Sequence, residues 1–230
     1  MTPGFELQGI GVRRDGVDVL VDVSVAIPTD GITVVAGPSG SGKSSLLRLL
    51  NRLDDPTAGV VRLDGADLRE LDPRALRRRV GMVFQRPVVF EGSVLDNLRT
   101  VARDLEPPDA ASRVAAVRLD PDLLDRDAAR LSEGEAQRLS IARTLTTDPE
   151  VVLADEPTAS LDAEARDGIE HLARSLDVSW VWVTHDIGQI ERLADHVVAI
   201  DAGRVPATGS LAELRAHHDP AVRRVVTETT

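Results

Sequence analysis

Apolar residues occur in short runs along this chain, and the spacing of these runs changes at two points. Residues 21–27 alternate valine or isoleucine with polar or small residues, a pattern that predicts a half-buried strand. Residues 32–36 and 151–154 are instead apolar on both faces, as buried parallel strands are. Between Arg86 and about Pro149 the spacing becomes helical, and afterwards strands and helices alternate again. This order predicts an α/β sheet with a helical insertion.

Turn and capping residues set the limits of several predicted elements. Asp15-Gly16 is a hairpin-type dipeptide that joins strands predicted at residues 5–7 and 17–21. Asp54-Asp55-Pro56 ends the first helix, because the residue before a proline leaves the helical region. A capping-box spacing at residues 210–213 begins a last helix, and a polar tail follows it.

We therefore expect a single domain over residues 1–230, since the chain has room for one large core. Residues 1–86 and 150–215 form the α/β core, with a β-rich lobe at the N-terminus. Residues 87–149 form the helical subdomain and residues 216–230 the polar tail.

The loop after the strand at residues 32–36 has the spacing G-x-x-x-x-G-K-S, and an apolar helical run follows it. Glycines let the backbone N–H groups of such a loop turn inward around a phosphate. The helix adds free N–H groups and the positive end of its dipole. We expect this loop to bind a nucleoside triphosphate through Gly37, Pro38, Ser39, Gly40, Ser41, Gly42, Lys43, Ser44 and Ser45. Lys43 would reach the β- and γ-phosphates, and Ser44 would be a ligand for Mg²⁺.

Composition supports this expectation at one position. Lys43 is the only lysine of the chain, and every other basic side chain is arginine or histidine. On a solvated surface arginine and lysine serve equally well, so a lysine kept only here indicates a chemical need for a compact ammonium group.

The overall balance of residues excludes other classes of function. The net charge of −11 argues against nonspecific nucleic-acid binding, which requires a basic surface. The chain has no cysteine, so neither disulfides nor a cysteine metal site is expected. No apolar run approaches the ~18 residues of a membrane span, and residues 1–6 do not resemble a signal peptide. We therefore expect a soluble, cytoplasmic protein unless a partner holds it at a membrane.

Two carboxylates follow the apolar strand at residues 151–154. In open α/β sheets ligands lie at the carboxyl ends of strands, which is where Asp155 and Glu156 stand. Asp155 is placed to hold Mg²⁺, directly or through water, and Glu156 to polarise an attacking water as a general base. An acidic pair after a strand is a weak pattern alone, and it becomes specific only with the phosphate loop upstream.

Six segments in order resemble those of the ATP-binding subunits of ABC transporters, of the stand-alone prokaryotic type. The six are the phosphate loop at residues 37–45, the single residue Gln85, and the segments at residues 131–135, 151–157, 160–162 (Ser160-Leu161-Asp162) and 184–186 (Thr184-His185-Asp186). The resemblance covers nearly the whole chain and implies a P-loop NTPase core of RecA type. It also implies hydrolysis of ATP with Mg²⁺, coupled to solute movement through separate membrane subunits.

The resemblance further implies roles for particular residues. Gln85 would touch Mg²⁺ or the attacking water and report to a membrane permease, and His185 would hydrogen-bond the γ-phosphate. Ser132 and Gly134 would close on the γ-phosphate of a second subunit, and Asp162 would cross to that subunit. The implied assembly is a homodimer or pseudo-dimer formed on ATP binding, held at the inner face of the cell membrane by its permease.

The chain departs from the family pattern in two places. Glu133 and Glu135 stand where the family has glycine and glutamine, and the spacing of Ser132 and Glu135 is also that of a capping box. The chain has no tyrosine, and the place of the usual adenine-stacking aromatic falls near Arg13 and Arg14. An arginine can lie flat on a base, so Arg14 is the predicted adenine contact.

Three functions are compatible with these patterns. The first is the ATPase of a transporter whose membrane subunits are separate chains. The second is a related ATPase that drives a non-transport complex, in the cell envelope or in DNA maintenance; the acidic charge opposes the DNA role. The third is a small-molecule kinase, which would need neither Gln85 nor the segment at residues 131–135. Trp180 and Trp182 alternate on one strand face, which predicts core packing rather than an adenine platform.

Overall fold

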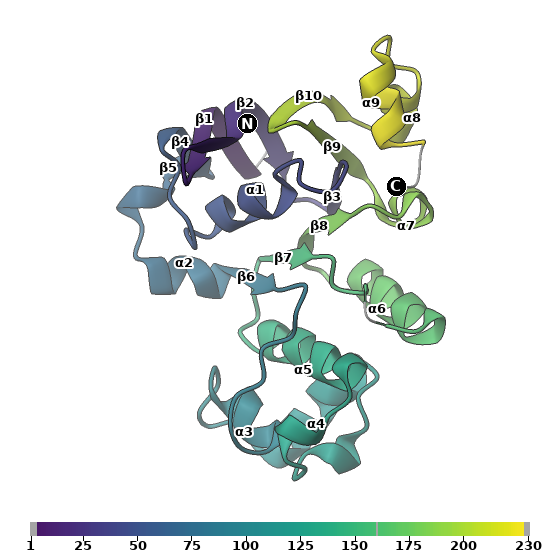
Figure 1. Ribbon diagram of the computed structural model, residues 1–230. Coiled ribbons are helices and arrows are strands. Elements are labelled where there is room, and N and C mark those ends of the chain that lie inside the picture. Colours follow the sequence, from purple (N-terminus) through teal and green to yellow (C-terminus); the bar gives the residue numbers. More distant parts are fainter. Residues whose placement is uncertain (1–3, 160, 228–230) are drawn as a thin grey trace.

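A mixed six-stranded sheet forms the centre of the computed structural model, which describes residues 4–159 and 161–227 (Figure 1). Five of its strands are parallel and one edge strand is antiparallel. In spatial order they are β10 (Arg204–Gly209), β9 (His196–Asp201), β3 (Ile32–Ala36), β8 (Ser179–Thr184), β7 (Val151–Asp155) and β6 (Val80–Val83). The predicted α/β class is confirmed.

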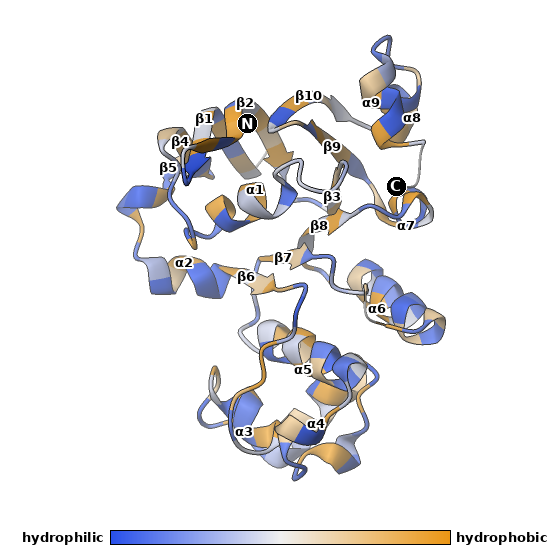
Figure 2. Ribbon diagram, viewed as in Figure 1, coloured by the Kyte–Doolittle hydropathy of each residue, from blue (hydrophilic) through white to orange (hydrophobic). Residues whose placement is uncertain are grey.

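Both faces of this sheet are covered, which explains why its central strands are apolar throughout. Every residue of β3 and β7 is buried. Alternate residues belong to opposite cores: Val35 packs with the leucines of α1 (Lys43–Leu50), and Val34 with the helices on the other face. Those helices are α5 (Glu133–Leu145), α6 (Ala163–Ser175) and α7 (Ile187–Leu193). Figure 2 shows the strands as largely hydrophobic and the outer surfaces of the helices as hydrophilic.

The N-terminal lobe is an antiparallel sheet of four strands in the order β2-β1-β4-β5. Its strands are β1 (Gly4–Arg14), β2 (Val17–Pro28), β4 (Ala58–Leu63) and β5 (Ala66–Asp67). The predicted hairpin is present, with positive φ angles at Asp15 and Gly16, as a two-residue turn of this kind requires. Both strands are longer than predicted: β1 continues to Arg14, and the stretches at residues 17–21 and 21–27 form one continuous strand.

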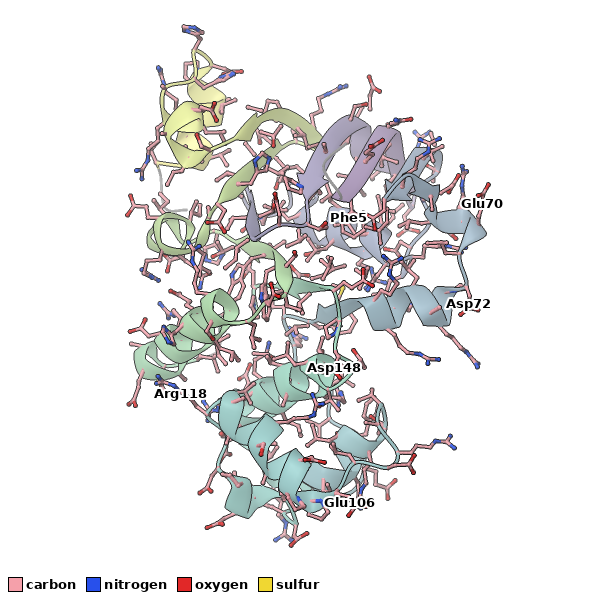
Figure 3. The ribbon with its side chains drawn as sticks, turned by 180° about the vertical axis from the view of Figure 1, so that it is seen from behind. Phe5, Glu70, Asp72, Glu106, Arg118 and Asp148 are labelled. Carbon is pink, nitrogen blue, oxygen red and sulfur yellow. The ribbon has the colours of Figure 1, made fainter. Side chains whose placement is uncertain are left out.

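Helices occupy the segment between β6 and β7, drawn in teal in Figure 1. They are α3 (Val94–Arg99), α4 (Pro107–Ala116), α5 and the 3-10 turns η2 (Pro121–Leu123) and η3 (Ala128–Arg130). Arg118 reaches from this segment to α6, where a Cβ on Gly168 would lie only 2.6 Å from its side chain (Figure 3). Between the lobe and β6 lie η1 (Leu68–Glu70) and α2 (Pro73–Arg79), whose N-cap is Asp72.

The first helix is shorter than predicted. It ends at Leu50 rather than at residues 54–56, because Arg52 adopts a left-handed conformation with φ of 54°. The N–H groups of Leu53 and Asp54 then both donate to the carbonyl of Arg48, which terminates the helix before the proline can.

The C-terminal segment also differs from the prediction. The expected polar tail at residues 216–230 contains α9 (Pro220–Val225), and Val222 and Val226 are fully buried against β9 and α8 (Leu211–Arg215). Residues 228–230 lie outside the described part. The antiparallel edge strand β10 is likewise absent from the prediction, because its alternating exposure leaves only a weak apolar pattern.

Candidate active site

The phosphate loop joins the carboxyl end of β3 to α1, and close packing explains two of its glycines. A Cβ on Gly37 would lie 2.0 Å from the carbonyl oxygen of Ile200. Gly42 has φ of 106°, and its Cβ would lie 2.7 Å from Leu20 and 3.0 Å from the carbonyl of Val19. Only glycine fits both positions, so the loop conformation is set by the strands β2 and β9 around it.

The Lys43 ammonium group is already bonded within this loop. Its Nζ donates to the carbonyl oxygens of Gly37 and Pro38, each at 2.8 Å. Burial lowers the pKa of Lys43, and the nearby carboxylates Glu156 and Asp155 oppose that shift. The ammonium group therefore lies among strong acceptors at the place where the sequence predicts phosphate.

Ser44 and Asp155 meet at the carboxyl ends of β3 and β7. The Ser44 hydroxyl donates to Asp155 Oδ1 at 3.0 Å. Burial raises the pKa of Asp155, and the Ser44 bond and the Lys43 charge only partly oppose it. Mg²⁺ prefers oxygen ligands such as a hydroxyl and a carboxylate, and the charge of the buried Asp155 carboxylate is only partly balanced by its neighbours. These residues therefore fit the predicted metal.

Glu156, Gln85 and His185 converge although they come from three different segments. The Gln85 amide Nε2 donates to Glu156 Oε2 at 3.4 Å, and His185 Nδ1 lies 3.2 Å from Glu156 Oε1. Glu156 itself has φ of 45°, and its N–H donates to the carbonyl of Val183 at 3.2 Å. This left-handed turn directs the Glu156 carboxylate across the ends of β7 and β8.

The segment at residues 131–135, called the signature below, contains Ser132 and Gly134. Both residues lie at the start of α5, which packs on the opposite face of the sheet from α1. Glu135 completes a capping box: its Oε2 accepts from the Ser132 N–H at 2.7 Å and from the Ser132 hydroxyl at 2.8 Å. These bonds lower the pKa of Glu135. The structure thus keeps the signature apart from the phosphate loop of the same chain, and Glu135 holds the Ser132 hydroxyl.

The remaining predicted residues have definite surroundings. Asp162 is the N-cap of α6, and its carboxylate accepts from the N–H of Ala165 at 2.8 Å. Ser160, from the same motif, lies outside the described residues. Arg14 forms an ion pair with Asp54, which also pairs with Arg48 of α1, so its guanidinium is engaged by a carboxylate. Its contact with adenine stays a prediction.

Trp180 and Trp182 are core residues, as expected. Both are almost fully buried, and their ring centroids lie 5.7 Å apart. Trp182 belongs to a buried polar group that the motifs do not reveal: its indole N–H donates to Gln189, which in turn donates to Thr158 and Glu170. The one trace of this group in the sequence is Glu170, a carboxylate on the apolar face of α6.

Among residues 4–159 and 161–227, no helix combines the length and the apolar character needed to cross a bilayer.

Comparison with known proteins agrees with the geometry. The ABC transporter family model matches residues 20–159. Protein STAR1 of Oryza sativa is 41% identical over 232 residues, which is 96% of this chain and 67% of that protein. The nickel import ATP-binding protein NikO of Rhodobacter capsulatus is 41% identical over 236 residues, covering 94% of this chain and 92% of that protein.

A solved structure of a bacterial Atm1-family ABC exporter with ATP bound superposes with a TM-score of 0.84 at 27% identity. The match covers 96% of this chain and 41% of the exporter chain. The family model and the relatives extend over the phosphate loop and the acidic pair described above. The chain belongs to the ABC transporter family, as one of its ATP-hydrolysing, ATP-binding subunits.

Proposed function

We propose that this subunit hydrolyses ATP with Glu156 as general base and works as a dimer attached to separate membrane permease subunits. The observation that supports the chemical part is the convergence of Gln85 and His185 on Glu156, beside Lys43 and Ser44. A base flanked by an amide and an imidazole, next to a phosphate loop, is what phosphoryl transfer to water needs.

In this mechanism Lys43 exchanges its bonds to Gly37 and Pro38 for oxygens of the β- and γ-phosphates. Glu156 takes a proton from a water whose oxygen bonds to the γ-phosphorus. The bond from that phosphorus to the β–γ bridging oxygen breaks, giving ADP and phosphate. His185 holds a γ-phosphate oxygen, and Gln85 orients the water. Mg²⁺, held by Ser44, Asp155 and Gln85, would neutralise charge on the phosphate oxygens.

The placement of the signature supports the proposed dimer. Ser132 and Gly134 lie at α5, across the sheet from α1, so they serve best the ATP of a second copy arranged head to tail. Asp162, at the N-terminus of α6, would cross to that copy in the same arrangement.

The partner surface that we propose is the segment after Gln85. Val88 and Phe90, two residues apart, are each 45% exposed, so this segment presents two apolar side chains at the surface. Because this segment begins at a residue bonded to Glu156, a permease bound here would be connected to the active site. Such a permease would hold the subunit at the inner face of the cell membrane, and nucleic acid has no part in this function.

The decisive experiment is the substitution Glu156→Gln. We expect it to retain ATP binding and to reduce turnover by roughly 10²–10⁴, the usual contribution of a positioned base. It should also trap an ATP-bound dimer, seen as a doubled mass in light scattering with ATP and Mg²⁺. Near-normal turnover would remove Glu156 from the role of base, and an unchanged mass would contradict the head-to-tail dimer.

A further inference from the structure

Behind the active site, Gln189 on α7 connects two segments that carry the proposed catalytic groups. Its Nε2 donates to Thr158 Oγ1 at 3.0 Å, and its Oε1 accepts from the indole N–H of Trp182 at 3.1 Å. Thr158 follows Glu156 by two residues, and Trp182 precedes His185 by three. One buried side chain therefore spans the loop of the base and the strand that leads to the histidine.

The chemistry of its neighbours fixes the orientation of the Gln189 amide. The Trp182 indole can only donate, so it must face the amide oxygen. The Glu170 carboxylate accepts from Gln189 Nε2 at 2.8 Å and from Arg192 Nε at 2.7 Å, so it must face the amide nitrogen. Gln189, Glu170 and Thr158 are 3%, 5% and 4% exposed, so water does not compete for these bonds.

Further hydrogen bonds connect Thr158 and Gln189 to the residues beside Asp162 and His185. Thr158 accepts at its carbonyl from Leu161, just before the cap Asp162. At its other end Gln189 donates its backbone N–H to Asp186, beside His185. Thr158, Asp186 and Gln189 also line a hollow next to Glu156 and His185, so a shift of Gln189 would change the shape of the site directly.

We propose that Gln189 is a positioning residue for ATP hydrolysis: by bonding Thr158 and Trp182 at once, it sets the separation of Glu156 and His185. The inference rests on the proposed roles of those two residues. An error of about 1 Å in such a separation can cost about a hundredfold in rate, whereas ATP binding depends on the phosphate loop. A loss of the Gln189 bonds should therefore lower kcat and leave the affinity for ATP unchanged.

The test compares Thr158→Val, Thr158→Ser, Gln189→Leu and the double variant Thr158→Val with Gln189→Leu. We expect Thr158→Val to lower kcat about ten- to a hundredfold, with the Kd for ATP within about twofold of the parent. Thr158→Ser keeps the hydroxyl and should restore kcat. Both changes break the bond between Thr158 and Gln189, so the double variant should be no slower than Gln189→Leu alone.

Two controls separate positioning from general loss of stability. Thr146→Val removes another buried hydroxyl, which donates to the Ala142 carbonyl at 2.8 Å, and should leave kcat unchanged. In a Trp180→Phe background the emission of Trp182 should shift in Gln189→Leu, which loses the indole acceptor. It should stay unchanged in Thr158→Val, which shows that this variant is folded around Gln189.

A Thr158→Val protein with parental kcat overturns the inference, as does a double variant whose loss is the product of the single losses. Glu156→Gln is measured alongside. If that variant keeps its turnover, the proposed base is wrong; if it is inactive while Thr158→Val is fully active, only the role of Gln189 is wrong.

Discussion

The side chains of Ser44 and Asp155, 111 residues apart in the chain, are joined by a hydrogen bond of 3.0 Å between Ser44 Oγ and Asp155 Oδ1. The bond connects the first turn of α1 to the end of β7. It leaves Asp155 as a buried carboxylate whose pKa is raised by burial. The native fold therefore disfavours the ionised form of this carboxylate, and the proposed cation would relieve that cost.

Asp155→Asn should accordingly stabilise the protein without nucleotide at neutral pH. A raised pKa in the folded state contributes stability below the unfolded pKa of about 3.9, and that stability is lost as pH rises through the raised value. Asparagine stays neutral, so the variant should gain most at neutral pH and nothing in strong acid. Thermal unfolding measures this, at about 2–4 °C per kcal/mol for a chain of this size.

The control for this comparison is Asp148→Asn, an exposed aspartate paired with Arg113, which should change the melting temperature little at any pH. The same Asp155→Asn protein should lose Mg²⁺-dependent ATP hydrolysis. If it melts below the parent at pH 7, burial of the Asp155 charge is not the dominant effect there.

Glu135→Gln should strengthen ATP-driven dimerisation. The Ser132 hydroxyl has one proton and donates it to the Glu135 carboxylate, so it must give up a charge-assisted bond before it can donate to a phosphate. A neutral glutamine accepts more weakly and repels a polyanion less. We expect dimerisation of the Glu156→Gln background to become roughly tenfold tighter, equivalent to about 1.4 kcal/mol.

The chain offers a matched control in α8, where Ser210 and Glu213 form the same capping box with the same atoms. Glu213→Gln changes an identical motif far from the signature, so its dimerisation should equal that of the background. Equal effects of the two substitutions would mean that Glu135 acts on helix stability alone.

Lys43→Ala should weaken nucleotide binding itself. Loss of hydrogen bonds from a charged donor costs about 1.5–3 kcal/mol, which corresponds to roughly ten- to a hundredfold in the Kd for ATP. Calorimetric titration with ATP measures it. Because Lys43 is the only lysine, an amine-reactive reagent modifies one side chain, and ATP should protect that site in the parent protein. Unprotected modification at saturating ATP would place the phosphates elsewhere.

Arg14→Tyr should tighten ATP binding, because an aromatic ring would supply base stacking worth about 1–3 kcal/mol. The parent Arg14 is instead paired with Asp54. The contacts to the phosphates do not distinguish adenine from guanine. Arg13→Tyr, at the neighbouring position, is the control and should change nothing. Selectivity for ATP over GTP that survives Arg14→Ala would assign the adenine contact to another residue.

Local patterns were enough to predict most of the fold. The apolar runs of β3 and β7, the turn at Asp15-Gly16 and the capping boxes of α5 and α8 all depend on neighbours within a few residues. Predictions failed where distant contacts contribute: the left-handed Arg52, which ends α1 early, donates to the carbonyls of Leu68 and Leu71, and β9 covers the apolar side of α9.

The order of residues along the chain was enough to predict the phosphate loop and the acidic pair after β7 and to single out the lone lysine, because each is a local feature with its own chemistry. Which groups face one another was decided by the tertiary structure. Parallel strands bring their carboxyl ends to one edge, and there Gln85 and His185 meet Glu156. Gln189 belongs to none of the sequence motifs. Its neighbours Thr158, Glu170 and Trp182 are bound to it only because the packing of α6 and α7 on the sheet excludes water from their polar groups.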